Sequence, residues 1–90
     1  MIKEKKDVSL QKTILESPTN QLILYNDDYN TFDFVIESLM EVCGHDPIIA
    51  EQCTLIVHFK GKCDIKSGSK ESLRPLQNEL DSRGLISVIE

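Results

Sequence analysis

The sequence predicts one small α+β domain, in which a three-stranded, mainly antiparallel sheet packs against three helices. Ninety residues are enough for a single compact core and too few for two. Short apolar runs typical of strands alternate with longer segments whose apolar residues recur at helical spacing, and together they give the order βααβαβ.

A polar turn separates the first strand from the first helix. Four apolar or aromatic residues, Leu22–Tyr25, predict a buried strand that stops at Asn26-Asp27-Asp28. A helix is expected over residues 31–43, with Asn30 as its N-cap and Gly44 as its stop. Its apolar residues fall at i, i+3, i+4, i+7 and i+11: Phe32, Val35, Ile36, Leu39 and Cys43.

A second helix is expected over Pro47–Lys60, because both of its ends carry helix signals. Asp46 is a suitable N-cap, a proline at the first helical position costs no hydrogen bond, and Gly61 follows the last turn. Residues 53–59 would also suit a strand on β propensity, so a strand there is the alternative.

The rest of the chain predicts a strand, a third helix and a final strand. Residues 63–67 alternate apolar and polar side chains, and residues 85–89 form an apolar run after a glycine. The helix between them contains Pro75, which is disfavoured beyond the first turn of a helix. That helix therefore begins either at Ser72, with Pro75 in its first turn, or at Ser69, with a kink at Pro75.

The pattern of charged and apolar residues divides the chain into residues 1–19 and residues 20–90. The first segment mixes alternating charges with isolated apolar residues, which predicts a mobile N-terminal tail, whereas the second carries the strands and helices of the core domain. No apolar run approaches the roughly 20 residues needed to span a bilayer, and the N-terminus lacks the apolar segment of a signal peptide. We therefore expect a cytoplasmic protein without membrane contact.

Charge and cysteine content narrow the classes of partner and cofactor. Ten basic and fifteen acidic residues give a formal net charge of −5, which argues against nucleic acid and favours a cationic ligand. Cys43, Cys53 and Cys63 include no C-x-x-C pair, so they indicate neither a disulfide framework nor a zinc site. We interpret them as small buried apolar residues and expect no metal and no cofactor.

The polar turn and His58 are the candidates for chemistry, because the second helix is expected to end near the turn. Asn and Asp at the end of a strand often only hold a turn, and a lone histidine is often a satisfied, partly buried side chain. A metal or hydrolytic site needs more ligands, or a nucleophile beside a base. The other possibility is a cation pocket in which Asn26, Asp27 and a neutral His58 accept hydrogen bonds from an ammonium group.

Four motifs occur together in this chain: Asn26-Asp27-Asp28-Tyr29, Phe34-Val35-Ile36, His58-Phe59-Lys60-Gly61-Lys62 and Glu71. With this spacing, residues 20–90 resemble the ATP-dependent Clp protease adaptor family, ClpS. The resemblance implies a βααβαβ domain that is not itself an enzyme. It implies an adaptor for N-degrons, which are proteins whose first residue is a large hydrophobic one, typically Leu, Phe, Tyr or Trp. Such an adaptor delivers them to the N-terminal domain of a Clp unfoldase of the AAA+ class.

The resemblance also implies roles for particular residues. It implies that the α-amino group of the degron is bound by Asn26, Asp27 and His58. It implies that the walls of the hydrophobic pocket are formed by Asn30, Phe32, Val35, Thr54 and Val57. Glu71 matches a position used in docking to the unfoldase, and the N-terminal tail resembles an extension that takes part in delivery.

The sequence departs from the family pattern at three places. Asn30-Thr31-Phe32 stands where the family usually has Thr-Pro-Met, and Thr54 replaces a second apolar residue, often Met. Pro75 and Leu76 stand where the family has polar residues, usually including a Lys. These departures affect the size of the pocket and the surface that meets the unfoldase.

A pocket of this composition selects chain termini for a physical reason. An α-amino group has a pKa of about 7.7–8.0, so at neutral pH it is mostly an ammonium with three donors, which a carboxylate, an amide oxygen and an imidazole nitrogen satisfy. Only a chain terminus has such a group. The alternative is a general protein-interaction domain of similar fold, like the C-terminal domain of the ribosomal stalk protein, in which the turn is structural.

Overall fold

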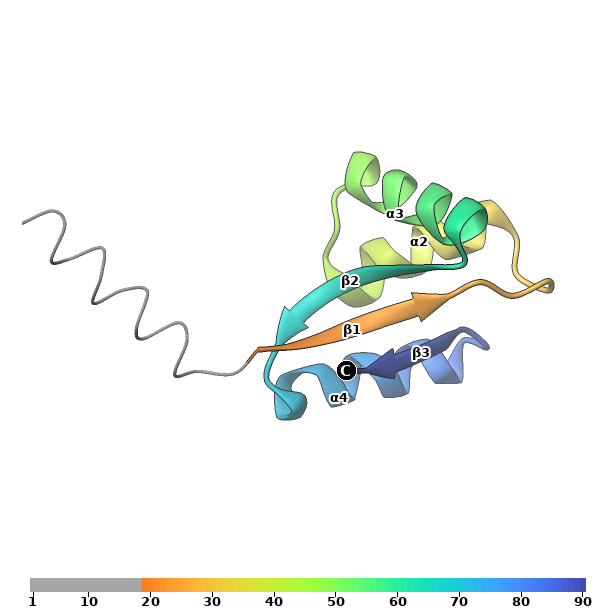
Figure 1. Ribbon diagram of the computed structural model, residues 1–90. Helices are drawn as coiled ribbons and strands as arrows, with labels where there is room; N and C mark the ends of the chain where they lie inside the picture. The colour runs from red at the N-terminus through yellow and green to blue at the C-terminus, as the bar shows by residue number, and fades with distance from the viewer. Residues whose placement is uncertain (1–18) are drawn as a thin grey trace, which may run out of the picture.

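The computed structural model describes residues 19–90, in which three strands form one sheet in the order β2-β1-β3 (Figure 1). The central strand β1 (Asn20–Tyr25) pairs antiparallel with β2 (Lys62–Gly68) on one side and with β3 (Ile86–Ile89) on the other. The predicted α+β class, element order and antiparallel sheet are confirmed. Apart from Thr19, the predicted mobile tail lies outside the described residues.

The three helices are α2 (Phe32–Cys43), α3 (Pro47–Lys60) and α4 (Lys70–Ser82). The predicted helix over Pro47–Lys60 is confirmed, and the alternative strand over residues 53–59 is wrong. Asp46 Oδ1 accepts a hydrogen bond from the Ile49 N–H at 2.9 Å, and Gly61 ends the helix with a φ of 92°, which only glycine adopts without strain.

The predicted N-cap of α2 was wrong by one residue. Thr31, not Asn30, caps the helix, because its Oγ1 accepts a hydrogen bond from the Phe34 N–H at 3.1 Å. Asparagine and threonine are both good caps, so composition alone does not decide between neighbours. The Asn30 side chain is instead bonded to Asp27 and Gly84.

Of the two predicted starts for the third helix, the structure has the one at Ser69. The Ser69 Oγ accepts a hydrogen bond from the Ser72 N–H at 3.1 Å, and α4 continues through Pro75 to Ser82. Because proline has no N–H, the Glu71 carbonyl, four residues earlier, lacks its helical donor. This carbonyl lies in the first turn of α4, next to the Glu71 side chain.

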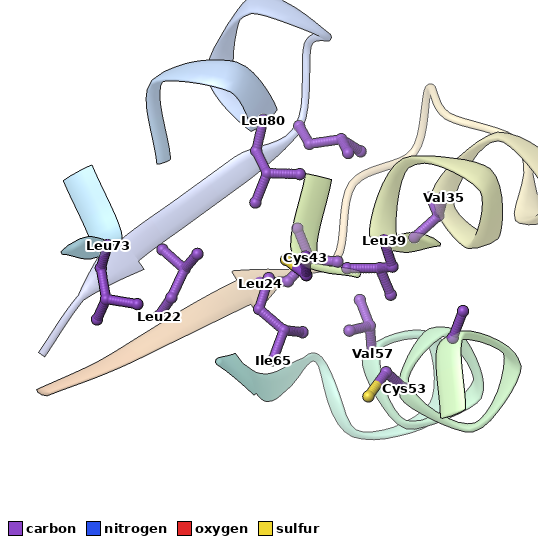
Figure 2. Close-up of a cluster of buried hydrophobic side chains, with 12 residues drawn as sticks. Leu22, Leu24, Val35, Leu39, Cys43, Cys53, Val57, Ile65, Leu73 and Leu80 are labelled. Atoms are coloured by element: carbon purple, nitrogen blue, oxygen red, sulfur yellow. The ribbon is translucent and has the colours of Figure 1, made fainter. Parts of the chain in front are cut away.

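Leu22 and Leu24 of β1 lie at the centre of the core, on the face of the sheet that the helices cover (Figure 2). Side chains alternate between the two faces of a strand, so Ile23 points to the opposite face, where it pairs with Val88 of β3. The core cluster contains residues from all three helices and all but the last strand: Leu22, Leu24, Val35, Leu39, Cys43, Ala50, Cys53, Val57, Ile65, Leu73, Leu80 and Leu85.

The cysteines behave as apolar packing residues. Cys43 and Cys53 are buried in the core, and Cys63 is half-buried. Burial raises the pKa of Cys43 to about 11, and burial together with the neighbouring Cys53 thiol raises the pKa of Cys63 to about 12. These two thiols therefore stay protonated at neutral pH and are poor nucleophiles and metal ligands.

Replacing Pro75 with alanine is expected to raise the free energy of unfolding by about 2–3 kcal/mol. A proline inside a helix costs about 3 kcal/mol, of which its stiffening of the unfolded chain returns up to about 1 kcal/mol. Urea unfolding followed by circular dichroism measures the difference, with Asn78→Ala on the same helix as the control. Equal or lower stability of Pro75→Ala would show that the proline is well accommodated in α4.

Candidate functional site

A cavity of about 340 Å³ opens where β1 ends, between the polar turn, α2 and α3. Its buried lining residues are mainly apolar: Leu24, Val35, Thr54, Val57 and Leu85. Its exposed lining residues are Asn26, Asp28, Phe32 and His58. The site therefore combines an apolar interior with a mainly polar opening, and the eight residues predicted for the α-amino group and the pocket walls all line it.

The turn is held against the end of α3 by a backbone hydrogen bond. The Asn26 N–H donates to the carbonyl of Gly61, the residue that ends α3, at 2.9 Å. His58 lies one turn before Gly61, so this bond keeps the ring of His58 next to the turn. Asn26 and His58, which are 32 positions apart in the sequence, thus meet at one opening, as expected from the sequence.

The Asp27 carboxylate accepts three hydrogen bonds within the turn. Its Oδ1 accepts from the backbone N–H groups of Tyr29 and Asn30, each at 2.8 Å, and its Oδ2 accepts from Asn30 Nδ2 at 2.9 Å. The same Nδ2 donates to the Gly84 carbonyl at 3.0 Å, which ties the turn to the segment before β3. The structural interpretation of the turn is therefore correct for Asp27, but a carboxylate has about four acceptor positions, and one remains for a ligand.

The hydrogen bonds keep Asp27 ionised. Partial burial by itself raises the pKa of the Asp27 carboxyl, but the bonds from the Asn30 side chain and from the backbone N–H groups of Asn30 and Tyr29 outweigh it, and the pKa lies below its ordinary value of 3.8. A negative charge is thus fixed at the edge of an apolar cavity.

The side chains of Asn26 and His58 form no hydrogen bond with any other residue in the range 19–90. The His58 ring is exposed and lies edge-on to Phe32, with ring centroids 5.8 Å apart. The alternative of a satisfied, partly buried histidine is therefore wrong.

The described residues offer no group of three or more His, Cys, Asp or Glu side chains that could hold a metal ion. The arrangement is suited to binding a cation that carries an apolar group.

The ClpS family model, described as ATP-dependent Clp protease adaptor protein ClpS, matches residues 15–85 of this sequence. The chain belongs to the ClpS family. The Acetivibrio thermocellus ClpS adapter is 41% identical over 61 residues, which cover 58% of this chain and 62% of the relative. The Clostridium acetobutylicum adapter is 44% identical over 52 residues, covering 57% of this chain and 52% of the relative. The chain thus matches a little over half the length of these ClpS relatives.

A solved ClpS structure has the same fold. The structure of Agrobacterium tumefaciens ClpS2 bound to L-phenylalaninamide matches 80% of this chain and 94% of that chain, with a TM-score of 0.69 and 18% sequence identity. At this identity the match supports the βααβαβ fold and not the details of the site.

Four residues that line the ClpS cavity were not predicted as site residues: Leu24, Tyr25, Asp28 and Leu85. The sequence indicates only a strand at Leu24 and Tyr25 and only a polar turn at Asp28. Leu85 lies 58 positions from Asp27 and has no local signal, because the Asn30–Gly84 hydrogen bond that brings its segment to the turn is a tertiary contact.

Glu71, predicted to contact the unfoldase, lies away from the cavity. It lines an open groove of about 550 Å³ on α4, with Lys70, Arg74, Pro75 and Asn78. Within residues 19–90 this groove shares no lining residue with the cavity at the end of β1. Within residues 19–90 no helix is long and apolar enough to cross a bilayer.

Proposed function

We propose that this chain is a cytoplasmic adaptor that binds proteins by their N-terminal residue and delivers them to the N-terminal domain of a Clp AAA+ unfoldase. Its ligands have a free α-amino group and a Leu, Phe, Tyr or Trp side chain at the first position. The observation that carries the proposal is the ionised Asp27 carboxylate, which lines the opening of an apolar cavity together with the Asn26 and His58 side chains.

Three acceptors match the three donors of an ammonium group. We assign one hydrogen bond each to Asn26 Oδ1, an Asp27 carboxylate oxygen and a neutral His58 nitrogen. The side chain of the first residue then enters the cavity between Val35, Thr54 and Val57. Binding of phenylalaninamide by the Agrobacterium tumefaciens relative supports this type of ligand, because that molecule has a free amine and a benzyl side chain.

Both parts of the ligand are needed for measurable affinity. Hydrogen bonds to charged groups contribute roughly 1.5–3 kcal/mol each, and burial of a Leu or Phe side chain contributes about 1.5–3 kcal/mol. Association costs about 4–15 kcal/mol of lost translational and rotational freedom, which offsets most of either contribution, so neither the amine nor the side chain binds tightly alone.

Fluorescence anisotropy with short peptides tests the proposal. Peptides that begin with Leu, Phe, Val or Ser are compared, each with a free and an acetylated amine. We expect tight binding only for free Leu and Phe, because an acetylated amine leaves the desolvated Asp27 carboxylate without a cation. Binding that is indifferent to the first residue and to acetylation would instead support a general protein-interaction domain.

Replacing Glu71 with lysine is expected to weaken binding to the N-terminal domain of a Clp unfoldase by about ten-fold or more. The substitution reverses a charge at the proposed contact and adds a third cation beside Lys70 and Arg74. Peptide binding stays unchanged, because the groove and the cavity are separate. Surface plasmon resonance measures the first effect, and Asp81→Lys, also exposed on α4, is the control. Equal losses for the two variants would place the contact elsewhere.

A further inference from the structure

An aromatic row crosses the opening of the cavity and continues onto the outer surface of α3. The ring of Phe32, which is 38% exposed, lies 5.8 Å from the ring of His58. The ring of Phe59 lies 5.0 Å from the ring of His58, again edge-on, and Phe59 is 77% exposed. Phe59 does not line the cavity, so the fold and the proposed α-amino site leave this side chain without a role.

Phe59 is part of a larger apolar surface on α3. Leu55 and Ile56 precede it by four and three positions, which places them beside it on the helix, and both are exposed. The opposite side of α3 is buried in the core through Cys53 and Val57. We call Leu55, Ile56 and Phe59 the α3 shelf. A helix that is apolar on its solvent side as well as on its core side usually binds something there.

The position of the shelf suggests which part of a ligand covers it. A polypeptide whose first side chain fills the cavity leaves through the opening, whose exposed residues are Asn26, Asp28, Phe32 and His58. In an extended chain, side chains alternate in direction and residues i and i+2 are about 6.5–7 Å apart. A chain that leaves across His58 therefore turns its third residue toward the same surface as its first, whereas its second residue points away.

We propose that the α3 shelf binds an apolar side chain at the third position of the polypeptide whose first residue occupies the cavity. This inference rests on the proposed function and extends the recognised sequence from one residue to two. Proteins with an apolar third residue would then bind more tightly than proteins with the same first residue and a polar or acidic third residue.

Peptides that share a free N-terminal Phe and differ at one position test this inference. On the wild-type chain, Leu in place of Ser at position 3 should raise the affinity about three- to ten-fold, as expected for partial burial of one aliphatic side chain. The same exchange at position 2 should change the affinity by less than about two-fold, because that side chain points away from the surface.

Two substitutions on the shelf and one elsewhere locate the effect. Phe59→Ser and Leu55→Ser should each reduce the position-3 preference, while binding of the peptide with Ser at position 3 stays the same. Ile86→Ser removes an apolar residue of β3 that is 52% exposed and does not line the cavity, so it should keep the preference. Circular dichroism of each variant establishes that it is folded.

The outcomes separate this inference from the proposed function. If peptides with a free N-terminal Phe bind equally well with Leu and with Ser at position 3, the inference about the α3 shelf is wrong and the proposed function stands. Failure of all peptides to bind overturns both. Self-association of the wild-type chain that Phe59→Ser abolishes, without a position-3 preference, would assign the shelf to a second copy and overturn the inference.

Discussion

Replacing Asp27 with asparagine is expected to weaken binding of a peptide with a free N-terminal Phe by about 10- to 150-fold, which corresponds to one charged hydrogen bond of about 1.5–3 kcal/mol. Asparagine keeps the shape of the side chain and removes its charge. The substitution also replaces one acceptor oxygen by a nitrogen that donates. Asn30 Nδ2 then loses the acceptor that lies 2.9 Å away in the wild type. Isothermal titration calorimetry measures the loss.

Asp28→Asn is the matched control for Asp27→Asn, because Asp28 is the adjacent acidic residue and also lines the cavity. Within residues 19–90 the Asp28 carboxylate takes part in no hydrogen bond, and its removal tests the general negative potential of the turn. We expect less than about a three-fold loss, as for an exposed charge. Similar losses for the two variants would mean that net charge attracts the ligand and that Asp27 makes no direct contact.

Acid unfolding gives an independent view of Asp27. Because its pKa is lower in the folded chain than in the unfolded chain, the ionised carboxylate stabilises the fold above about pH 5, and this contribution is lost as the pH falls through the folded value. The stability of Asp27→Asn should therefore decline less steeply below about pH 4 than that of the wild type.

Replacing Thr54 with phenylalanine is expected to reduce binding of peptides that begin with Phe or Trp by about 10- to 100-fold, because most of the 1.5–3 kcal/mol from side-chain burial is lost. Thr54 is buried and lines the cavity, and its Oγ1 bonds the Ala50 carbonyl at 2.7 Å within α3. A ring at this position occupies space in the cavity of about 340 Å³. Peptides that begin with Leu should lose less, because their side chain is smaller.

Thr54→Val is the matched control, since valine has the shape of threonine without the hydroxyl group. The Ala50 carbonyl keeps its helical N–H partner, so both fold and binding should change little. If Thr54→Phe remains folded and binds peptides that begin with Phe with the same affinity as the wild type, the first side chain does not enter between Thr54 and Val57.

The sequence predicted the fold where local signals were strong. The Asp46 cap, the proline after it and Gly61 fixed both ends of α3 against the β propensity of its middle. Local signals did not decide between Asn30 and Thr31 as the cap of α2, because either side chain can accept the N–H bond. The choice depends on Asp27 and Gly84, which engage Asn30.

The candidate site was predicted in part. Asn26, Asp27 and His58 were expected to meet, and the bond from the Asn26 N–H to the Gly61 carbonyl explains why they do. The sequence does not indicate the double use of Asp27, as holder of the turn and as a charge at the opening, because the same Asn-Asp-Asp pattern suits either role. Leu85 has no local pattern and depends on the tertiary contact at Gly84.

Titration of the chain with L-phenylalaninamide, followed residue by residue in ¹H–¹⁵N NMR spectra, tests the central claim most directly. This ligand has the free amine and the aromatic side chain and little else, and N-acetyl-L-phenylalaninamide is its control. We predict that the free amine alone shifts the signals of Asn26, Asp27, Thr54, Val57 and His58. Shifts confined to α4, equal shifts with the acetylated compound, or no shifts would contradict recognition of the N-terminal residue at this cavity.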